Sequence, residues 1–144
     1  MPNVAIAAPN TAAADAGQAL VEAGGNAIDA ALAAAFVTMV NEVGIVSPSA
    51  GGFLTIQPPG GGPVTVDGWM DMPGRGHRER LGSGTWDVHT DYGGGVTVTI
   101  GPGSVATHGA IAAFGEVHAR WGRLPWAELV APAIDVARGG FRLS

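Results

Sequence analysis

The most apolar stretch of the chain runs from Ala27 to Val40 and is interrupted only by Asp29 and Thr38. A helix that is apolar on nearly every side is typical of a buried position, so the pattern predicts a core helix here. At about 1.5 Å per residue this helix is roughly 20 Å long, which is too short to span a membrane. Its many alanines should allow neighbouring elements to approach closely.

A chain reversal leads into this core helix. Gly24 and Gly25 can adopt the positive φ that ends a preceding helix. Asn26 is a preferred N-cap residue, and Asp29 lies three residues later, where its carboxylate can reach back to the N–H of Asn26. The sequence therefore predicts two helices joined by a very short turn.

The preceding helix should be capped by Asn10 or Thr11 and run to Ala23, with Asp15 in its first turn. Its buried face is expected to contain Ala13, Ala16 and Leu20. Before this helix, residues 4–8 form a short apolar run, which is typical of a buried strand.

Alternating patterns predict strands after the core helix. Residues 53–57 and 64–69 should form a hairpin across a loop with three consecutive glycines. Residues 96–100 also alternate as a strand should. The fold class expected from these elements is α+β.

Two amphipathic helices are predicted to complete the chain. The first should follow the turn at residues 101–103 and end near Trp121. The second should have Pro125 at its first position, and Pro132 inside it should kink it. The inward positions of these helices are expected to be Ile111, Phe114, Val117, Trp121, Trp126, Leu129, Val130, Ala133 and Ala137.

A long segment from Met70 to about Gly95 has no clear pattern, and loops of this length are usually functional or disordered. It contains Arg75, His77, Arg78, Arg80 and His89. The three arginines could bind a carboxylate in a bidentate manner. Alternatively, they form a solvated loop face.

Composition limits the possible functions. Of the 144 residues, 47% are hydrophobic and only 13% are charged, with a mean hydropathy of +0.26, so we expect another chain or subunit to cover part of the surface. The net charge of −5 argues against a nucleic-acid partner, and without cysteines there is neither a disulfide framework nor a thiol nucleophile. The first residues carry no signal-peptide pattern, so the expected location is the cytoplasm, with no membrane partner.

Residue chemistry alone names no reaction. The four histidines lack the spacing that places metal ligands on one helix face, so neither a metal nor a cofactor is expected. One of His108 and His118 should be solvated and the other should meet a packing need. Gly51 and Gly52 could form a backbone site for an anion, but two glycines before a strand more often allow tight packing. No serine lies in a nucleophile-elbow motif.

Several longer motifs follow one another in a specific order: Asp15-Ala16-Gly17, Gly24 to Ala31, Glu42 with Gly51-Gly52-Phe53, Gly101-Pro102-Gly103, and Trp121 to Trp126 with Pro132 to Phe141. This order resembles the gamma-glutamyltranspeptidase family over nearly the whole chain. The resemblance implies an N-terminal nucleophile hydrolase with an αββα sandwich, incomplete without a partner chain. Residues 1–144 would then be a single-domain fragment, the N-terminal segment of the large subunit.

The resemblance also implies how such a protein works. The precursor cuts itself into a large and a small subunit, and the threonine at the new N-terminus is the nucleophile, with its own α-amino group as the base. No such threonine motif occurs here, so the catalytic residue is expected on the partner small subunit, and the rest of the large subunit should also be a partner. The substrate would be a small-molecule amide.

One position departs from the family pattern. Where family members have an arginine that holds the α-carboxylate of the γ-glutamyl group, this chain has Trp69, between the matching Asp67 and Pro73. Tryptophan offers one N–H and an apolar face instead of a guanidinium fork. We therefore predict a substrate site formed by Trp69, Met70, Arg75 and Arg78 that accepts an apolar or aromatic acyl group, or a larger amide. In the alternatives, Arg75, Arg78 or Arg80 replaces the missing arginine, or Trp69 is a core residue.

Two other classes of function stay open. The chain could be a catalytically inactive structural or interaction subunit of the same fold, or a small-molecule binding module built on the Gly51-Gly52 turn. Whether a partner chain begins with Thr, Ser or Cys distinguishes an enzyme from the inactive subunit.

Overall fold

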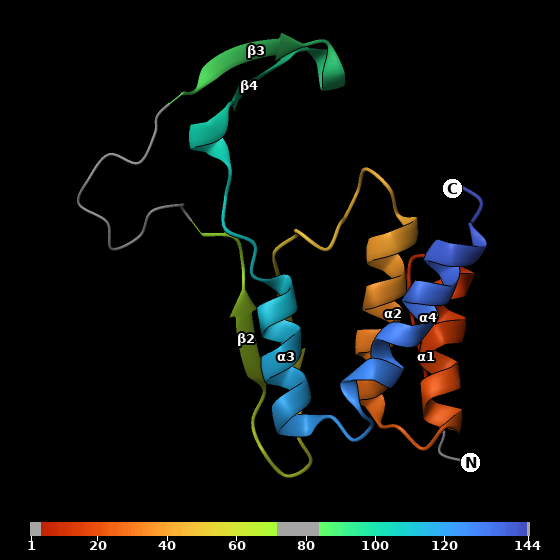
Figure 1. Ribbon diagram of the computed structural model, residues 1–144. Coiled ribbons are helices and arrows are strands. Elements are labelled where there is room, and N and C mark those ends of the chain that lie inside the picture. The colour runs from red at the N-terminus through yellow and green to blue at the C-terminus, as the bar shows by residue number, and fades with distance from the viewer. Residues whose placement is uncertain (1–3, 72–83, 144) are drawn as a thin grey trace.

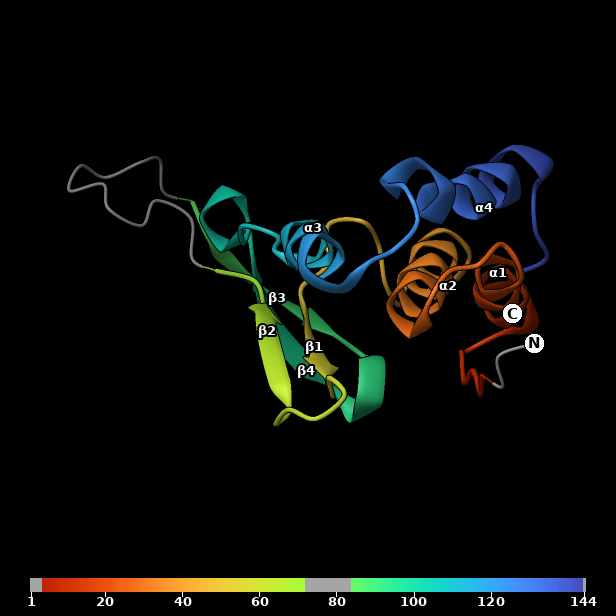
Figure 2. The same cartoon turned by 90° about the horizontal axis from the view of Figure 1, so that it is seen from below.

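The computed structural model describes residues 4–71 and 84–143. Within them the helices and strands are, in chain order, α1 (Thr11–Glu22), α2 (Ala27–Asn41), β1 (Gly52–Ile56), β2 (Val64–Gly68), β3 (Trp86–Thr90), η1 (Tyr92–Gly94), β4 (Val96–Ile100), η2 (Pro102–Ser104), α3 (Ala110–Trp121) and α4 (Trp126–Gly139). Helices α1, α2 and α4 pack together, and α3 lies between α2 and the β1–β2 hairpin (Figures 1 and 2). This arrangement is α+β, as the sequence predicts. No helix in the described part of the chain combines the length and hydropathy that crossing a bilayer requires.

The turn between α1 and α2 has the predicted capping chemistry. The Asn26 side chain accepts hydrogen bonds from the N–H groups of Ile28 and Asp29, and the Asp29 carboxylate accepts one from the N–H of Asn26. Gly24 has a φ of +94°, which ends α1 in the left-handed region, whereas Gly25 has no positive φ. A Cβ on Gly25 would lie 2.6 Å from the Leu20 carbonyl oxygen, so this second glycine is needed for close packing.

The core is centred on α2, which packs against all three other helices. Phe36 meets Phe114 of α3 and Trp126 of α4 edge-on, with both ring centroids 5.3 Å away. Ala31, however, is exposed, so the expectation that α2 is buried on every side is wrong for one stripe. Ala31 lines one pocket that is shared with residues 4–9 and another that is shared with β1 and α3.

Helix α1 follows its prediction except at one residue. The Asn10 side chain accepts a hydrogen bond from the N–H of Ala13, which makes Asn10 the N-cap. The predicted inward face is buried. Because the helix begins at Thr11, Asp15 lies in its second turn, and the expectation of an acidic first turn is wrong.

Two antiparallel hairpins supply the strands. In the first, β1 pairs with β2 from Gly52 opposite Gly68 to Ile56 opposite Val64, as predicted to within one residue. In the second, β3 pairs with β4, and Trp86 lies opposite Ile100. Strand β3 lies within the segment in which the sequence shows no clear pattern, although Trp86, Val88 and Thr90 alternate there as a strand should.

Residues 4–8 do not form the predicted strand. They are extended, and their side chains alternate between half-buried and exposed along α2, but in the described part of the chain no strand lies beside them. A strand requires a hydrogen-bonded neighbour, which a sequence pattern alone cannot supply.

The two C-terminal helices agree with their predicted positions, with local differences. Helix α3 begins only at Ala110, so His108 precedes it, and Pro125 is the N-cap of α4 instead of its first residue. Ala137 is exposed and not part of the inward face, whereas the neighbouring Val136 packs against the core. The helix continues through Pro132.

Candidate functional site

An exposed aromatic pair lies where β1 begins and β2 ends. The rings of Phe53 and Trp69 stack with centroids 5.5 Å apart and an angle of 9° between their planes. Phe53 is 61% and Trp69 54% exposed, so Trp69 is not a core residue of the described structure. We call Phe53 and Trp69 the aromatic pair.

The hairpin register and one side-chain hydrogen bond place this pair. Phe53 lies opposite Asp67 in the β1–β2 ladder, and Trp69 follows β2 directly. The Asp67 carboxylate accepts a hydrogen bond from the N–H of Trp69 at 2.9 Å, which is the local turn that Asp favours after a strand. The two rings are thus fixed from both strands of the same hairpin.

Gly51 is required for the close approach of two chain segments here. A Cβ at this position would lie 2.6 Å from the Met70 nitrogen and 3.0 Å from the Trp69 carbonyl carbon. A Cβ on Gly52 would meet nothing within 4 Å, and neither glycine has a positive φ. The structure therefore favours tight packing over an anion-binding turn for Gly51, whereas Gly52 has free space around it.

A pocket of about 490 Å³ lies beside Trp69 and Met70. The other residues that line it are Gly44, Ile45, Val46, Ser47, Ala50 and Gly51. None of these described side chains carries a charge, so nothing in this lining would neutralise a bound carboxylate. Arg75 and Arg78, the other two predicted site residues, and Arg80 lie outside the described residues.

A second polar centre joins the α1–α2 turn to the loop before α4. The Asp29 carboxylate is fully buried and accepts hydrogen bonds from the N–H groups of Asn26 at 2.8 Å, Arg123 at 3.0 Å and Leu124 at 3.3 Å. The Asn26 side chain donates to the Trp121 carbonyl at 2.7 Å. Because its oxygens are occupied by backbone donors, Asp29 serves the fold here and is not available for catalysis.

Sequence reasoning missed half of this centre. It predicted the contact between Asp29 and Asn26 but not the contacts with Arg123 and Leu124, about 94 residues further along the chain. The available signal was a lone carboxylate in an apolar helix, which needs partners when it is buried. His118 has the expected packing role, since its Nε2 lies 2.8 Å from the Leu124 carbonyl oxygen, whereas His108 is exposed.

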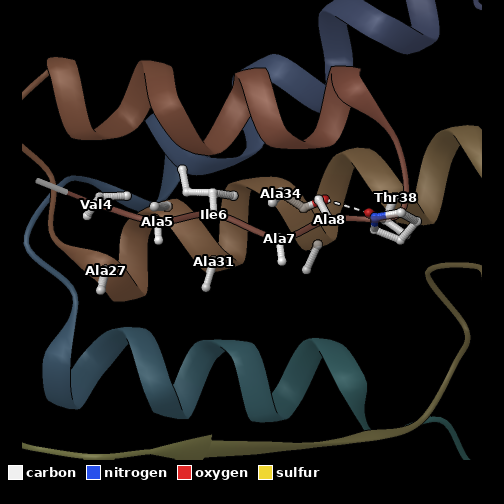
Figure 3. A pocket seen from close by; sticks show the side chains of 12 residues that line it. Val4, Ala5, Ile6, Ala7, Ala8, Ala27, Ala31, Ala34 and Thr38 are labelled. Atoms are coloured by element: carbon white, nitrogen blue, oxygen red, sulfur yellow. Dashed lines mark hydrogen bonds between the residues drawn. The ribbon is translucent and has the colours of Figure 1, made fainter.

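The N-terminal segment and α2 enclose another pocket, of about 390 Å³ (Figure 3). Val4, Ile6 and Ala8 line it from one side, and the labelled alanines and Thr38 of α2 from the other. The Thr38 hydroxyl donates to the Ala34 carbonyl within the helix, so the pocket offers no free reactive group among these residues. Nowhere in residues 4–71 and 84–143 do three His, Asp or Glu side chains gather as a metal ion would require.

Comparison with known proteins gives the class and then the family. The solved structure of a gamma-glutamyltranspeptidase from Pseudomonas nitroreducens complexed with L-DON matches the whole chain, with a TM-score of 0.76 and 28% identity, and the match covers 41% of that chain. The fold is therefore part of an N-terminal nucleophile hydrolase fold. The sequence profile described as gamma-glutamyltranspeptidase matches residues 13–144, and the chain belongs to this family.

Two curated relatives share this region. A glutathione hydrolase proenzyme from Pseudomonas aeruginosa is 33% identical over 97% of this chain, and an Acylase ACY 1 proenzyme from a Pseudomonas species is 36% identical over 88% of it. These matches cover 24% and 23% of the relatives. The chain thus spans about a quarter of the length of the curated proteins it matches.

Proposed function

We propose that this chain is the N-terminal large-subunit segment of an amidohydrolase or acyltransferase that cleaves an amide bond of a small molecule. Family membership supports the type of reaction, and the relatives' designation as proenzymes supports processing into two subunits. The nucleophilic threonine belongs, in this proposal, to the partner small subunit.

The proposed reaction follows from that nucleophile. The threonine hydroxyl oxygen attacks the acyl carbon, and its proton passes through the α-amino group to the amine that leaves as the C–N bond breaks. Water, or an acceptor amine, then attacks the resulting ester and frees the threonine hydroxyl. The described residues of this chain supply the acyl-binding surface and none of the reacting groups.

The acyl group is proposed to differ from an ordinary γ-glutamyl group. The observation that carries this proposal is Trp69, at the position where the family arginine would bind the α-carboxylate. The lining of the adjacent pocket supports it, because Met70 and Ile45 extend the apolar surface and no described lining residue is charged. A carboxylate bound there without a cationic partner would lose an interaction worth on the order of 2–5 kcal/mol. One of the curated relatives, moreover, is named an acylase.

A second candidate is a catalytically inactive subunit of the same fold. Ile45, Phe53 and Trp69 are exposed, and an exposed apolar surface is typical of a site where another protein binds. This observation favours the inactive subunit. In that case Trp69 would be covered by the partner and no substrate would reach it.

The experiment that separates the two candidates is intact-mass measurement and N-terminal sequencing of the protein purified with its partners. The enzyme proposal expects a partner chain that begins with Thr, and loss of amide cleavage when this residue is replaced by Ala. A partner beginning with a residue that has neither a hydroxyl nor a thiol would support the inactive subunit.

A further inference from the structure

Building on the proposed acyl-transfer function, we infer that the aromatic pair binds a planar aromatic acyl group, and that Phe53 is the positioning residue that orients Trp69 for this purpose. The inference narrows the substrate class from any apolar acyl group to an aromatic one. It also gives a role to a residue outside the four predicted site residues.

The geometry of the pair supports this assignment. With an angle of 9° between the ring planes, Phe53 covers one face of the indole, while 54% of Trp69 remains exposed. The indole is also fixed at its backbone by Asp67 and at the next residue by the close approach of Met70 to Gly51. Trp69 is therefore held by Phe53 and by its own backbone contacts, and about half of it stays exposed where it lines the pocket.

The chemistry of that surface favours one kind of ligand. Flat π-systems attract each other in offset-stacked arrangements. This attraction raises the binding affinity by a factor of about 3 to 10 above the affinity that burial of the same apolar area provides. A saturated ring of the same size buries a similar area but cannot stack in this way. The described pocket lining offers few polar groups and no charge. These residues can therefore distinguish one acyl group from another by its shape and by π-stacking.

The Phe53 ring is needed to hold the indole in place. Without it, the indole would lose the ring that covers one of its faces and would rotate more freely about its side-chain bonds, which weakens binding by the entropy of ordering it again. A leucine at position 53 keeps an apolar, smaller side chain but not the stacking, whereas a tyrosine keeps the aromatic ring and its stacking. Position 53 lies on an exposed strand face opposite Asp67, so these substitutions should not disturb the core.

The test measures binding, which does not depend on cleavage. The protein, assembled with its partners, is titrated calorimetrically with phenylacetamide and with cyclohexylacetamide, which match in size and charge and differ in aromaticity. We expect phenylacetamide to bind about 3 to 10 times more tightly. Phe53→Leu should abolish this preference, and Phe53→Tyr should restore it. Tyr92→Leu, which removes an aromatic ring that is 84% exposed on the other hairpin, should leave it unchanged.

Equal affinity for the two amides, or a preference that persists in Phe53→Leu, would overturn the inference. Loss of binding in Phe53→Leu that Phe53→Tyr does not rescue would also overturn it, because it would show a merely structural role. If phenylacetamide is preferred but no anilide of any acyl group is cleaved, the stacking site stands and the proposed reaction fails.

Discussion

Asp29 offers the most quantitative test of the fold. Replacing it with Ala removes the acceptor for three backbone N–H groups in a fully buried position, those of Asn26, Arg123 and Leu124. Each buried donor that loses its partner costs about 1–3 kcal/mol. Partial entry of water reduces the sum, so we expect Asp29→Ala to lower the free energy of unfolding by about 3–5 kcal/mol. An ordinary N-terminal cap is worth only about 1 kcal/mol.

The assay is urea unfolding of the protein assembled with its partners. The loss of stability is taken from the shift in the urea midpoint, with the slope of the free energy of unfolding against urea concentration unchanged. Asp15→Ala is the matched control, since Asp15 is exposed in α1 and its loss should change stability by no more than about 0.5 kcal/mol. The stability loss of Asp29→Asn should lie between those of Asp29→Ala and Asp15→Ala. Asparagine keeps one acceptor oxygen but directs an NH₂ group at backbone donors. A loss below about 1 kcal/mol for Asp29→Ala would refute the reasoning and leave Asp29 as a simple cap.

Three further predictions concern packing. Ala34→Arg should prevent folding, because Ala34 is buried against the core. Ala31→Arg should reduce only assembly with the partner, because Ala31 is exposed in this chain. Soluble yield and size-exclusion chromatography measure both outcomes. Gly51→Ala should cost about 1–3 kcal/mol in thermal unfolding and weaken amide binding, while Gly52→Ala, with free space around it, should be nearly neutral. Residues 1–144 expressed alone should bind hydrophobic dyes and melt without a sharp transition; a monodisperse monomer with cooperative melting would contradict the need for a partner.

Much of the helical architecture could be predicted from local chemistry. The Asn26–Asp29 capping box, the end of α1 at Gly24 and the apolar run of α2 each depend on residues within a few positions of one another. Such signals are fully present in the sequence. The stripe around Ala31 was predicted as buried, because an apolar pattern does not say which element covers it.

Features that depend on distant parts of the chain could not be predicted in the same way. Residues 4–8 have a strand pattern but no described neighbour to pair with, and the link from Asp29 to Arg123 joins segments about 94 residues apart. At the site, the resemblance to the family drew attention to Trp69, but its stacking on Phe53 depends on the register of the β1–β2 hairpin. Trp69 and Met70 line one pocket, and a substrate-binding role for Trp69, Met70, Arg75 and Arg78 stays a prediction.

The central claim, that Trp69 changes the acyl group accepted by an amide-cleaving enzyme, is tested most directly by comparing two anilides on the assembled protein. The γ-glutamyl anilide carries the α-carboxylate, and the 4-aminobutanoyl anilide differs only in lacking it. We expect kcat/KM for the γ-glutamyl compound to be lower by about 30-fold, since a lost bidentate pair of roughly 2 kcal/mol corresponds to this factor. Trp69→Arg should reduce or reverse the difference. Efficient wild-type cleavage of the γ-glutamyl anilide that is abolished by Arg75→Ala or Arg78→Ala would contradict the claim and assign carboxylate binding to those arginines.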